Sequence, residues 1–408
     1  MKSVLVGLVL ASFIAAATSA DSLDNLFNQA NQDTIVKTPG PPVENPTLDR
    51  PVFLYFGNLQ TQGAFATGWE SAMDQSPATS LYYYLHLKGG IDVQPIPQAR
   101  LIGTFSTYLP QELDSSVISN LQDGSTQSVS TISTVPSVTT SNVLSLDELF
   151  LDYTVADSLV FRVGKFVQTW GYGHLFNPGN IVTTTSEGVN LKGFVTSGPF
   201  EITGLVIGDS EFFSNKAHPL ASELGYAGQI NFLSGFFTAG LSAYEQIKEG
   251  ATYDASIKTN VLGTDFYAEG LEYYLTSLQS WTPGALLGAY RVLQWPVPGK
   301  AIAEYWINGS SGNSADRSIG LGFVTDKIAS LQDFQFKVKW LHSLYDGSGQ
   351  VVTGVSFTPF PEMDIGLGVP WTYGDNGSTY ILGNTDPESR RLAVFLTVNI
   401  SLSFEKGK

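Results

Sequence analysis

Acidic and basic side chains alternate with apolar ones in residues 145–170, a pattern that could place paired charges on one surface. Glu148 and Asp152 share the parity of Arg162 and Gln168, whereas leucine, valine and aromatic residues fill many of the intervening positions. Because successive side chains of a strand point to opposite faces, the spacing predicts a hairpin with these four polar groups on one face. A carboxylate opposite a guanidinium reduces the desolvation penalty of both groups, so this face suits a partly enclosed polar space. The alternative is a structural row of salt bridges that stiffens the sheet without binding a ligand.

Lys165 and Trp170 are further candidates for the same surface. Lys165 falls on the apolar parity, so its ammonium group must either reach back towards water or be turned inward by a bulge. Weaker candidates follow from strand parity alone, and they are Tyr82, Tyr84, His86, Lys337, Lys339 and Arg391. Aromatic rings beside hydrogen-bonding groups suit the faces of sugars, and they equally suit an aromatic girdle at a membrane interface.

The strand that ends the sequence indicates which kind of sheet must position these side chains. In residues 391–404, apolar side chains occupy every second position, namely Leu392, Val394, Leu396, Val398, Ile400, Leu402 and Phe404. A tilted strand needs ~9–11 residues to cross a bilayer, whereas strands of globular proteins usually have ~5–6. The length and the terminal aromatic residue predict a transmembrane strand, with a long strand of a soluble β-sandwich as the alternative.

The same alternation recurs in about 18 segments between residues 53 and 404, with 16 the next expectation because the segments in residues 251–275 are the least distinct. Connections between segments are mostly short and long in turn, as in outer-membrane barrels, where periplasmic turns are short and outer loops are long. The expected fold is therefore all-β, a closed antiparallel transmembrane β-barrel over residues 51–408. The longest connection, residues 110–144, is expected to be either a mobile outer loop or a loop folded into the lumen.

The composition agrees with a protein that has two contrasting surfaces. Charged residues are 14% of the 408 residues, about half the usual share, while the mean hydropathy is only +0.05. An apolar exterior around a weakly charged interior has this balance. The formal net charge of −16 argues against nucleic acid as a partner. The absence of cysteine excludes disulfides and thiolate metal sites.

Residues 1–20 have the pattern of a cleaved signal peptide. Lys2 precedes the apolar run 4–17, and small residues precede Asp21, where a signal peptidase would cut. The apolar run is shorter than the ~20 residues that a membrane-spanning helix needs. Residues 21–50 are expected to form a short helix and a proline-rich linker, either loosely docked or acting as a plug or an oligomer-forming helix. The expected location is the bacterial outer membrane.

The hairpin also carries a resemblance to known proteins. The runs Leu-Asp-Glu-Leu-Phe-Leu-Asp-Tyr at 146–153, Phe-Arg-Val-Gly-Lys-Phe-Val-Gln-Thr-Trp-Gly at 161–171 and Phe-Asn-Pro at 176–178 resemble a hairpin of substrate-selective outer-membrane porins, including carbohydrate-selective and alginate-export types. The likeness covers about 35 residues, and Phe166-Val167 separates Lys165 from Gln168 where the family has an adjacent basic and amide pair. The resemblance implies passive, selective transport of a small polar solute, often a sugar or sugar acid. It assigns pore-lining roles to Glu148, Arg162, Lys165, Gln168 and Trp170.

The sequence contains no catalytic or metal-binding motif that would favour an enzyme. The four histidines have no metal-ligand spacing, and there is no nucleophile elbow, phosphate loop or dinucleotide fingerprint. We therefore expect a non-enzymatic channel without cofactor or metal, in contact with outer-membrane lipid, assembled through its C-terminal strand by the barrel-assembly machinery, and compatible with a homo-oligomer. Two alternatives remain open, namely a plugged structural or adhesive barrel and a transporter of hydrophobic substrates.

Overall fold

The computed structural model describes residues 52–70, 78–109, 145–156, 158–182, 189–208, 224–246, 250–276, 279–294, 298–309, 316–325, 333–375, 378–380 and 391–407. The strands of the first half are β1 (Val52–Glu70), β2 (Ala78–Ile96), β3 (Ala99–Leu109), β4 (Ser145–Ala156), β5 (Leu159–Lys165), β6 (Val189–Ser197), β7 (Phe200–Gly208), β8 (Leu224–Leu233) and β9 (Phe237–Gln246). Those of the second half are β10 (Gly250–Val261), β11 (Thr264–Leu275), β12 (Ser280–Leu293), β13 (Gly299–Ile307), β14 (Arg317–Thr325), β15 (Phe334–Ser343), β16 (Gly349–Phe360), β17 (Met363–Tyr373) and β18 (Arg391–Gly407). No helix in these ranges is long and apolar enough to cross a membrane.

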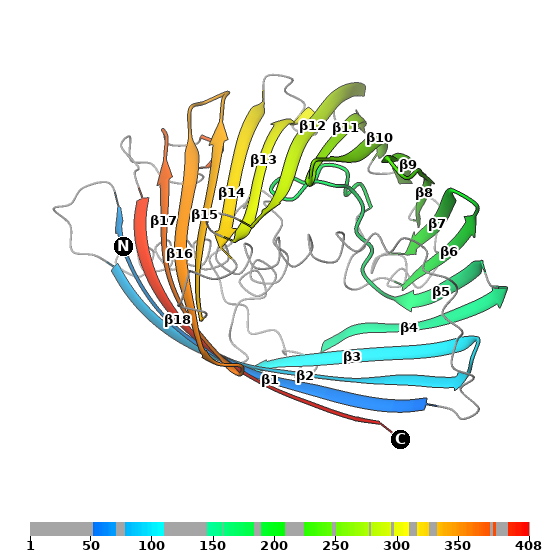
Figure 1. Ribbon diagram of the computed structural model, residues 1–408, viewed down its shortest axis with the longest axis horizontal. Coiled ribbons are helices and arrows are strands. Elements are labelled where there is room, and N and C mark those ends of the chain that lie inside the picture. The colour runs from blue at the N-terminus through cyan, green and yellow to red at the C-terminus, as the bar shows by residue number, and fades with distance from the viewer. Residues whose placement is uncertain are drawn as a thin grey trace.

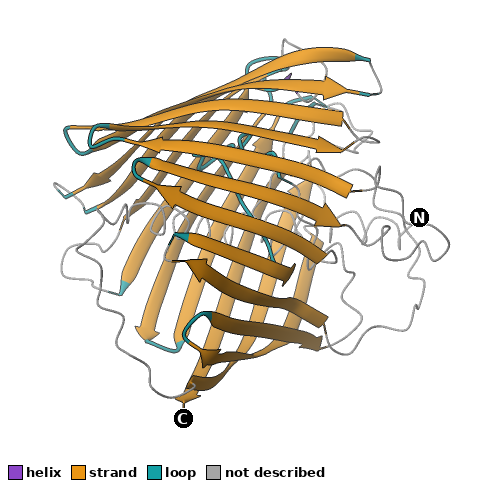
Figure 2. Cartoon of the chain, turned by 90° about the vertical axis from the view of Figure 1, so that its right-hand side faces the viewer, coloured by secondary structure: helices purple, strands orange, loops and turns teal. Residues whose placement is uncertain are grey.

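Each strand pairs antiparallel with its neighbours in sequence, and β1 also pairs with β18, which closes the sheet (Figures 1 and 2). The closing register runs from Leu54 opposite Gly407 to Glu70 opposite Arg391. Closure satisfies the hydrogen bonds that both edge strands would otherwise leave open. The predicted all-β, closed antiparallel barrel and its count of 18 strands are confirmed.

The outer face of the barrel is apolar and exposed. In β18, Leu392, Leu396, Ile400 and Leu402 are between 37% and 51% exposed, as the predicted alternation requires. The same holds across the barrel for the outward residues of β4 and β5, such as Leu151 and Val163. Soluble monomers rarely expose a continuous apolar surface of this extent.

Two parts of the predicted organisation differ from the structure or lie outside it. The predicted hairpin in residues 145–170 is wrong at its end, because its second strand, β5, stops at Lys165. Gly164 has a φ of +133°, and a Cβ there would lie 2.1 Å from the carbonyl oxygen of Leu149, so only glycine permits the backbone to leave the sheet at this point. Residues 1–51 and the connection 110–144 lie outside the described residues, so the signal peptide, the linker and the fate of that loop stay predictions.

Candidate functional site

Five charged side chains line neighbouring strands on the inner side of the barrel. This charged row consists of Asp92 on β2, Arg100 on β3, Asp152 on β4, Arg162 on β5 and Lys192 on β6. The register sets Arg100 opposite Asp152, Asp152 opposite Arg162, and Arg162 opposite Lys192. Residues directly opposite one another share a face of the sheet, so the row continues across five strands. Three positive and two negative charges leave one positive charge in the row.

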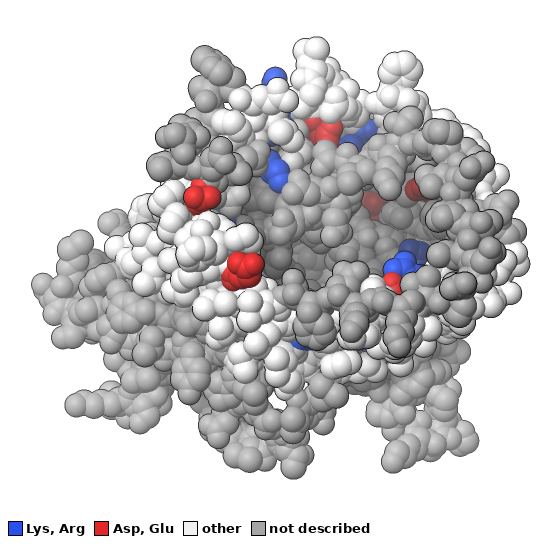
Figure 3. Space-filling view, turned by 60° about the horizontal axis from the view of Figure 1, so that its bottom comes forward, with Lys and Arg blue, Asp and Glu red and all other residues white. Residues whose placement is uncertain are grey.

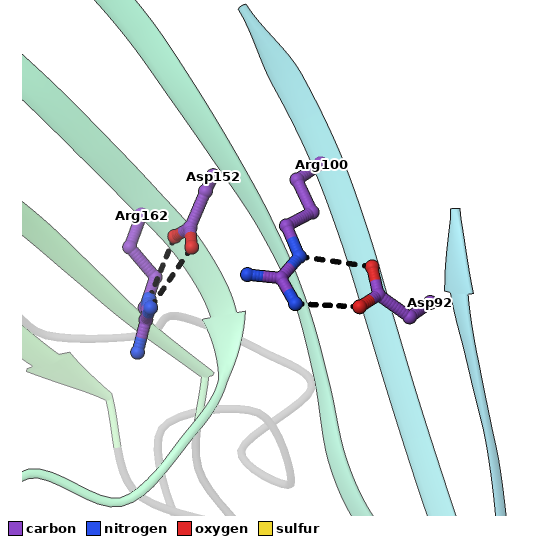
Figure 4. A network of polar contacts seen from close by, with 4 residues as sticks. All are labelled: Asp92, Arg100, Asp152 and Arg162. Atoms are coloured by element: carbon purple, nitrogen blue, oxygen red, sulfur yellow. Dashed lines mark hydrogen bonds and ion pairs between the residues drawn. The ribbon is translucent and has the colours of Figure 1, made fainter. Parts of the chain in front are cut away.

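Two pairs in the row have bidentate geometry (Figure 4). Arg162 donates from Nε and Nη2 to the two carboxylate oxygens of Asp152 at 2.7 and 2.9 Å. Arg100 makes the same contact with Asp92 at 2.9 and 2.5 Å. The Arg162 guanidinium also lies 4.1 Å from the centroid of the Phe150 ring, which adds a cation–π contact and fixes its plane. The predicted pairing of Asp152 with Arg162 is thus present.

Glu148 and His86 lie on the same inner wall, further along the strands. A register shift between β3 and β4 after Thr104 sets Glu148 opposite Thr104, and Asp147 accepts a hydrogen bond from the Ser106 hydroxyl at 2.7 Å. The bulge therefore turns two successive acidic residues to the buried side, which strict alternation does not allow. His86 is close enough to Asp147 for an electrostatic interaction.

Among the remaining candidates of the hairpin, Gln168 and Trp170 lie beyond the end of β5, and Lys165 is its last residue. Gln168 accepts a hydrogen bond from Nζ of Lys192 at 2.8 Å, so the last cation of the charged row binds a neutral amide. Lys165 donates to the carbonyl oxygen of Leu146 near the start of β4. Trp170 is only 5% exposed and packs in the barrel interior, where its backbone is held by two asparagines.

Residues 166–182, which we call the inner loop, cross the inside of the barrel after β5 (Figure 1). The loop begins and ends in one apolar cluster, in which Phe166, Trp170, Ile181 and Val182 pack with Phe150, Leu205, Ile207, Tyr244 and Leu271. Its tip contributes Leu175 and Phe176 to a second cluster with inward side chains of β11 to β16. Burying each large apolar side chain stabilises this arrangement by roughly 1.5–3 kcal/mol. The inner loop therefore fills the side of the barrel opposite β1.

Two carboxylates of the wall, Glu269 on β11 and Glu304 on β13, hold the backbone of the inner loop. Glu304 accepts the N–H groups of His174, Leu175 and Phe176 at 2.6, 3.0 and 2.7 Å. Glu269 accepts the N–H of Tyr172 and, at 3.0 Å, that of Gly179. The hydroxyl of Tyr267 donates to Glu304 at 2.5 Å. Buried carboxylates need such donors, and five loop amides supply them.

The hydrogen bond between the N–H of residue 179 and Glu269 depends on glycine at this position. A Cβ at this position would lie 2.5 to 2.8 Å from the carboxylate atoms of Glu269, closer than any side chain tolerates. The missing side chain lets the carboxylate reach the backbone N–H.

His174, at the tip of the inner loop, is buried between two tyrosine rings. Its ring centroid lies 5.4 Å from that of Tyr267 and 5.0 Å from that of Tyr290. Burial, reinforced by the positive charge of Lys258 and opposed by Asp265, lowers the pKa of His174 to about 4. The imidazole is therefore neutral at pH 7.

Two other predicted site residues, Lys337 and Lys339, lie on β15, away from the strands of the charged row. Lys337 and Lys339 on β15 are 7% and 2% exposed, and Lys339 is close enough to Glu304 to interact with it electrostatically. The side chains of Tyr82, Tyr84 and Arg391 lie outside the described residues. The face shown in Figure 3 is hollowed at its centre, and charged side chains of both signs lie around and within the hollow.

Sequence reasoning missed Asp92, Arg100 and Lys192 of the charged row, and both wall carboxylates. Strand parity contained the signal for all five, because each lies in a segment that was predicted as a strand. No local sequence pattern predicted that residues 166–182 would fold into the barrel interior. Among the described residues, no group of three or more His, Asp or Glu side chains could hold a metal ion.

No protein-family model matches the chain, and no curated protein matches it. Several solved structures do match the fold of the chain. The chain is similar to OccK3 (OpdO) of Pseudomonas aeruginosa, with a TM-score of 0.53, 11% identity, and coverage of 86% of this chain and 96% of that one. It is similar to OccK8 (OprE) of the same organism, with a TM-score of 0.50, 8% identity and coverage of 86% and 98%. It is also similar to Pseudomonas aeruginosa OpdK with vanillate, with a TM-score of 0.50, 9% identity and coverage of 86% and 99%. At these identities the likeness concerns the fold.

Proposed function

We propose that this protein is an outer-membrane channel through which small polar solutes diffuse passively and selectively, and that it is not an enzyme. The observation that supports the proposal is that the barrel is apolar on its outer surface and charged on its inner surface, the reverse of a soluble protein. Large apolar side chains are exposed around the outside of a closed barrel, while the charged row faces the interior. A lipid exterior accommodates the first feature and a water-filled path accommodates the second.

The solute class that the charged row favours is anionic. The charged row has one more cation than carboxylates, and Lys192 at its end binds only the neutral amide of Gln168 among the hydrogen bonds described here. A solute carboxylate could bind there without displacing an existing ion pair. Sugar acids, expected from the resemblance, fit this requirement, as does vanillate, the small aromatic carboxylate named with the OpdK structure.

The location and assembly follow from the same proposal. An N-terminal signal peptide would export the chain, and the strand at its C-terminal end would present an aromatic, alternating segment to the barrel-assembly machinery. The partners are outer-membrane lipid and the transported solute. Tyr253 and Trp281, near the starts of β10 and β12, stack with their ring centroids 5.5 Å apart, and exposed aromatic rings of this kind suit the membrane interface.

Reconstitution into planar lipid bilayers tests the proposal. We expect stepwise conductance increases, and a reversal potential in a salt gradient that indicates preference for anions. Liposome swelling with sugar acids should be faster than with neutral sugars of the same size. Absence of conductance at high protein load, with the barrel shown to be folded by its heat-modifiable migration on gels, would exclude an open channel.

One observation favours a second function. The apolar clusters that anchor the inner loop fill part of the interior, and a barrel closed in this way would serve as a structural or adhesive protein. That function requires zero solute flux, so the same bilayer measurement separates it from transport.

A further inference from the structure

We propose that Glu269 and Glu304 set the size limit of the solute path by pinning the inner loop to the wall, and that neither glutamate contacts the solute. The proposal rests on the channel function above and assigns to the two residues a positioning role. Size selection would then depend on β11 and β13, whereas charge selection depends on the row across β2 to β6.

The two glutamates form one anchoring platform. Each side chain points inward from its strand, and β12 lies between the two strands. On β12, Leu286 is opposite Glu269 and Gly288 is opposite Glu304. The two carboxylates are thus offset by only two positions along the strand that separates them. Their acceptor oxygens face amides from residues 172–179, so both ends of the loop tip are fixed.

Hydrogen bonds, rather than the apolar contacts, give the loop one position. Apolar packing is non-directional and tolerates small displacements with partial loss of contact. A displaced loop would take five amide N–H donors away from the two buried carboxylates. Glu269 would lose both of its loop donors, Glu304 would keep the Tyr267 hydroxyl, and each group left unsatisfied costs roughly 1–3 kcal/mol or more. The loop amides and the two glutamate carboxyl groups therefore hold each other in place.

The test uses Glu269→Gln, Glu304→Gln and the double variant. A glutamine keeps the shape, but its NH2 group would face loop N–H donors, so at least one hydrogen bond becomes a repulsive contact. Asp254→Asn is the matched control, because Asp254 is a buried carboxylate on β10 that accepts a hydrogen bond from Ser242, another wall residue, at 3.0 Å.

Liposome swelling with neutral solutes of increasing size gives the size limit. We expect the glutamine variants to admit solutes that the parent protein excludes, with a several-fold gain in their swelling rates. The reversal potential, which reports charge selectivity, should stay unchanged. Asp254→Asn should retain the parent size limit.

A second readout does not depend on transport. The chain has no cysteine, so Pro178→Cys provides a single site for a spin label in the inner loop. We expect the label to become more mobile in the glutamine variants and to stay immobile with Asp254→Asn.

The outcomes separate the two proposals. A parent protein without conductance contradicts the channel function. A conducting parent whose folded glutamine variants keep both the size limit and the label immobility overturns the role of the glutamates. If those variants fail to fold, Gly179→Ala supplies the test, because its methyl group pushes the loop away from Glu269 and leaves the wall intact; an unchanged size limit there also overturns the proposal.

Discussion

The backbone N–H of Phe176 lies 2.7 Å from a carboxylate oxygen of Glu304, 128 residues further along the chain. This hydrogen bond joins the tip of the inner loop to β13, and it gives the barrel interior two chemically different sides. One side is apolar and tied to the loop, and the other carries the charged row.

Replacing Lys192 by methionine should make the channel less selective for anions. The substitution removes the excess positive charge of the row and keeps an unbranched side chain that is one heavy atom shorter. We expect the reversal potential in a tenfold salt gradient to move towards the value for cations. Arg291→Met is the control, because Arg291 lies next to the inward Tyr290 on β12 and thus on the outer parity; an equal shift in that variant would contradict the assignment.

The Asp152–Arg162 pair should show a measurable coupling in a double-mutant cycle of Asp152→Asn and Arg162→Met. The contact is bidentate, but the side chains are 20% and 33% exposed, so solvent screening limits the coupling to about 1 kcal/mol. The quantity to measure is the free energy of unfolding in denaturant for the parent, the two single variants and the double variant. Additive effects of the single substitutions would mean that the pair contributes nothing to stability.

Leu241→Arg should destabilise the barrel, because Leu241 lies at the middle of β9 with 64% of its side chain exposed on the outer wall. An arginine near the bilayer midplane costs ~2–4 kcal/mol, whereas one near the interface costs ~0–1 kcal/mol. Leu262→Arg, in the turn between β10 and β11, is the matched control at 90% exposure. Equal unfolding free energies for both variants in lipid vesicles would argue against a membrane-embedded wall.

The inner loop should lose stability in mild acid through His174. Burial lowers its pKa from 6.5 to about 4, so the unfolded state binds a proton that the folded state excludes between these values. The stabilisation is therefore complete above pH 6.5 and decreases as the pH falls towards 4, by at most about 3 kcal/mol. His174→Gln keeps the backbone N–H to Glu304 and should flatten this pH dependence of the unfolding midpoint; the same slope in both proteins would contradict it.

Asp346, in the turn between β15 and β16, should link two connections at one end of the barrel. Its carboxylate accepts the N–H and hydroxyl of Thr379 at 2.6 and 2.7 Å and those of Ser348 at 2.9 and 2.6 Å. Partial burial opposes ionisation, but these four hydrogen bonds outweigh it and lower the pKa of Asp346.

A group with a lowered pKa stabilises the fold above its ordinary value of 3.8 and loses this effect as the pH falls below it. Asp346→Asn should therefore lower the free energy of unfolding at pH 7 by about 1 kcal/mol. The difference in this free energy from the parent should shrink below pH 3.8. Thr379→Val, which removes only a hydroxyl, should have a smaller effect. A difference that grows in acid would contradict this account.

The sequence alone determined the barrel. Alternation of period two places a side chain on one face or the other regardless of distant contacts, so the exposed row from Leu392 to Leu402 and the paired Asp152 and Arg162 could be predicted from local pattern. The recurrence of that pattern predicted about 18 strands, and the mostly alternating lengths of the connections indicated an outer-membrane barrel.

Tertiary structure alone decided which residues meet inside. β5 ends at Lys165, one residue after Gly164 with its positive φ, and no pattern in residues 158–170 distinguishes this end from a continuing strand. The partners of the inner loop, Glu269 and Glu304, follow it by 90 to 130 residues. Closing the sheet brings them opposite the loop, because hydrogen bonds and apolar contacts across a barrel depend on distance in space and not on spacing along the chain.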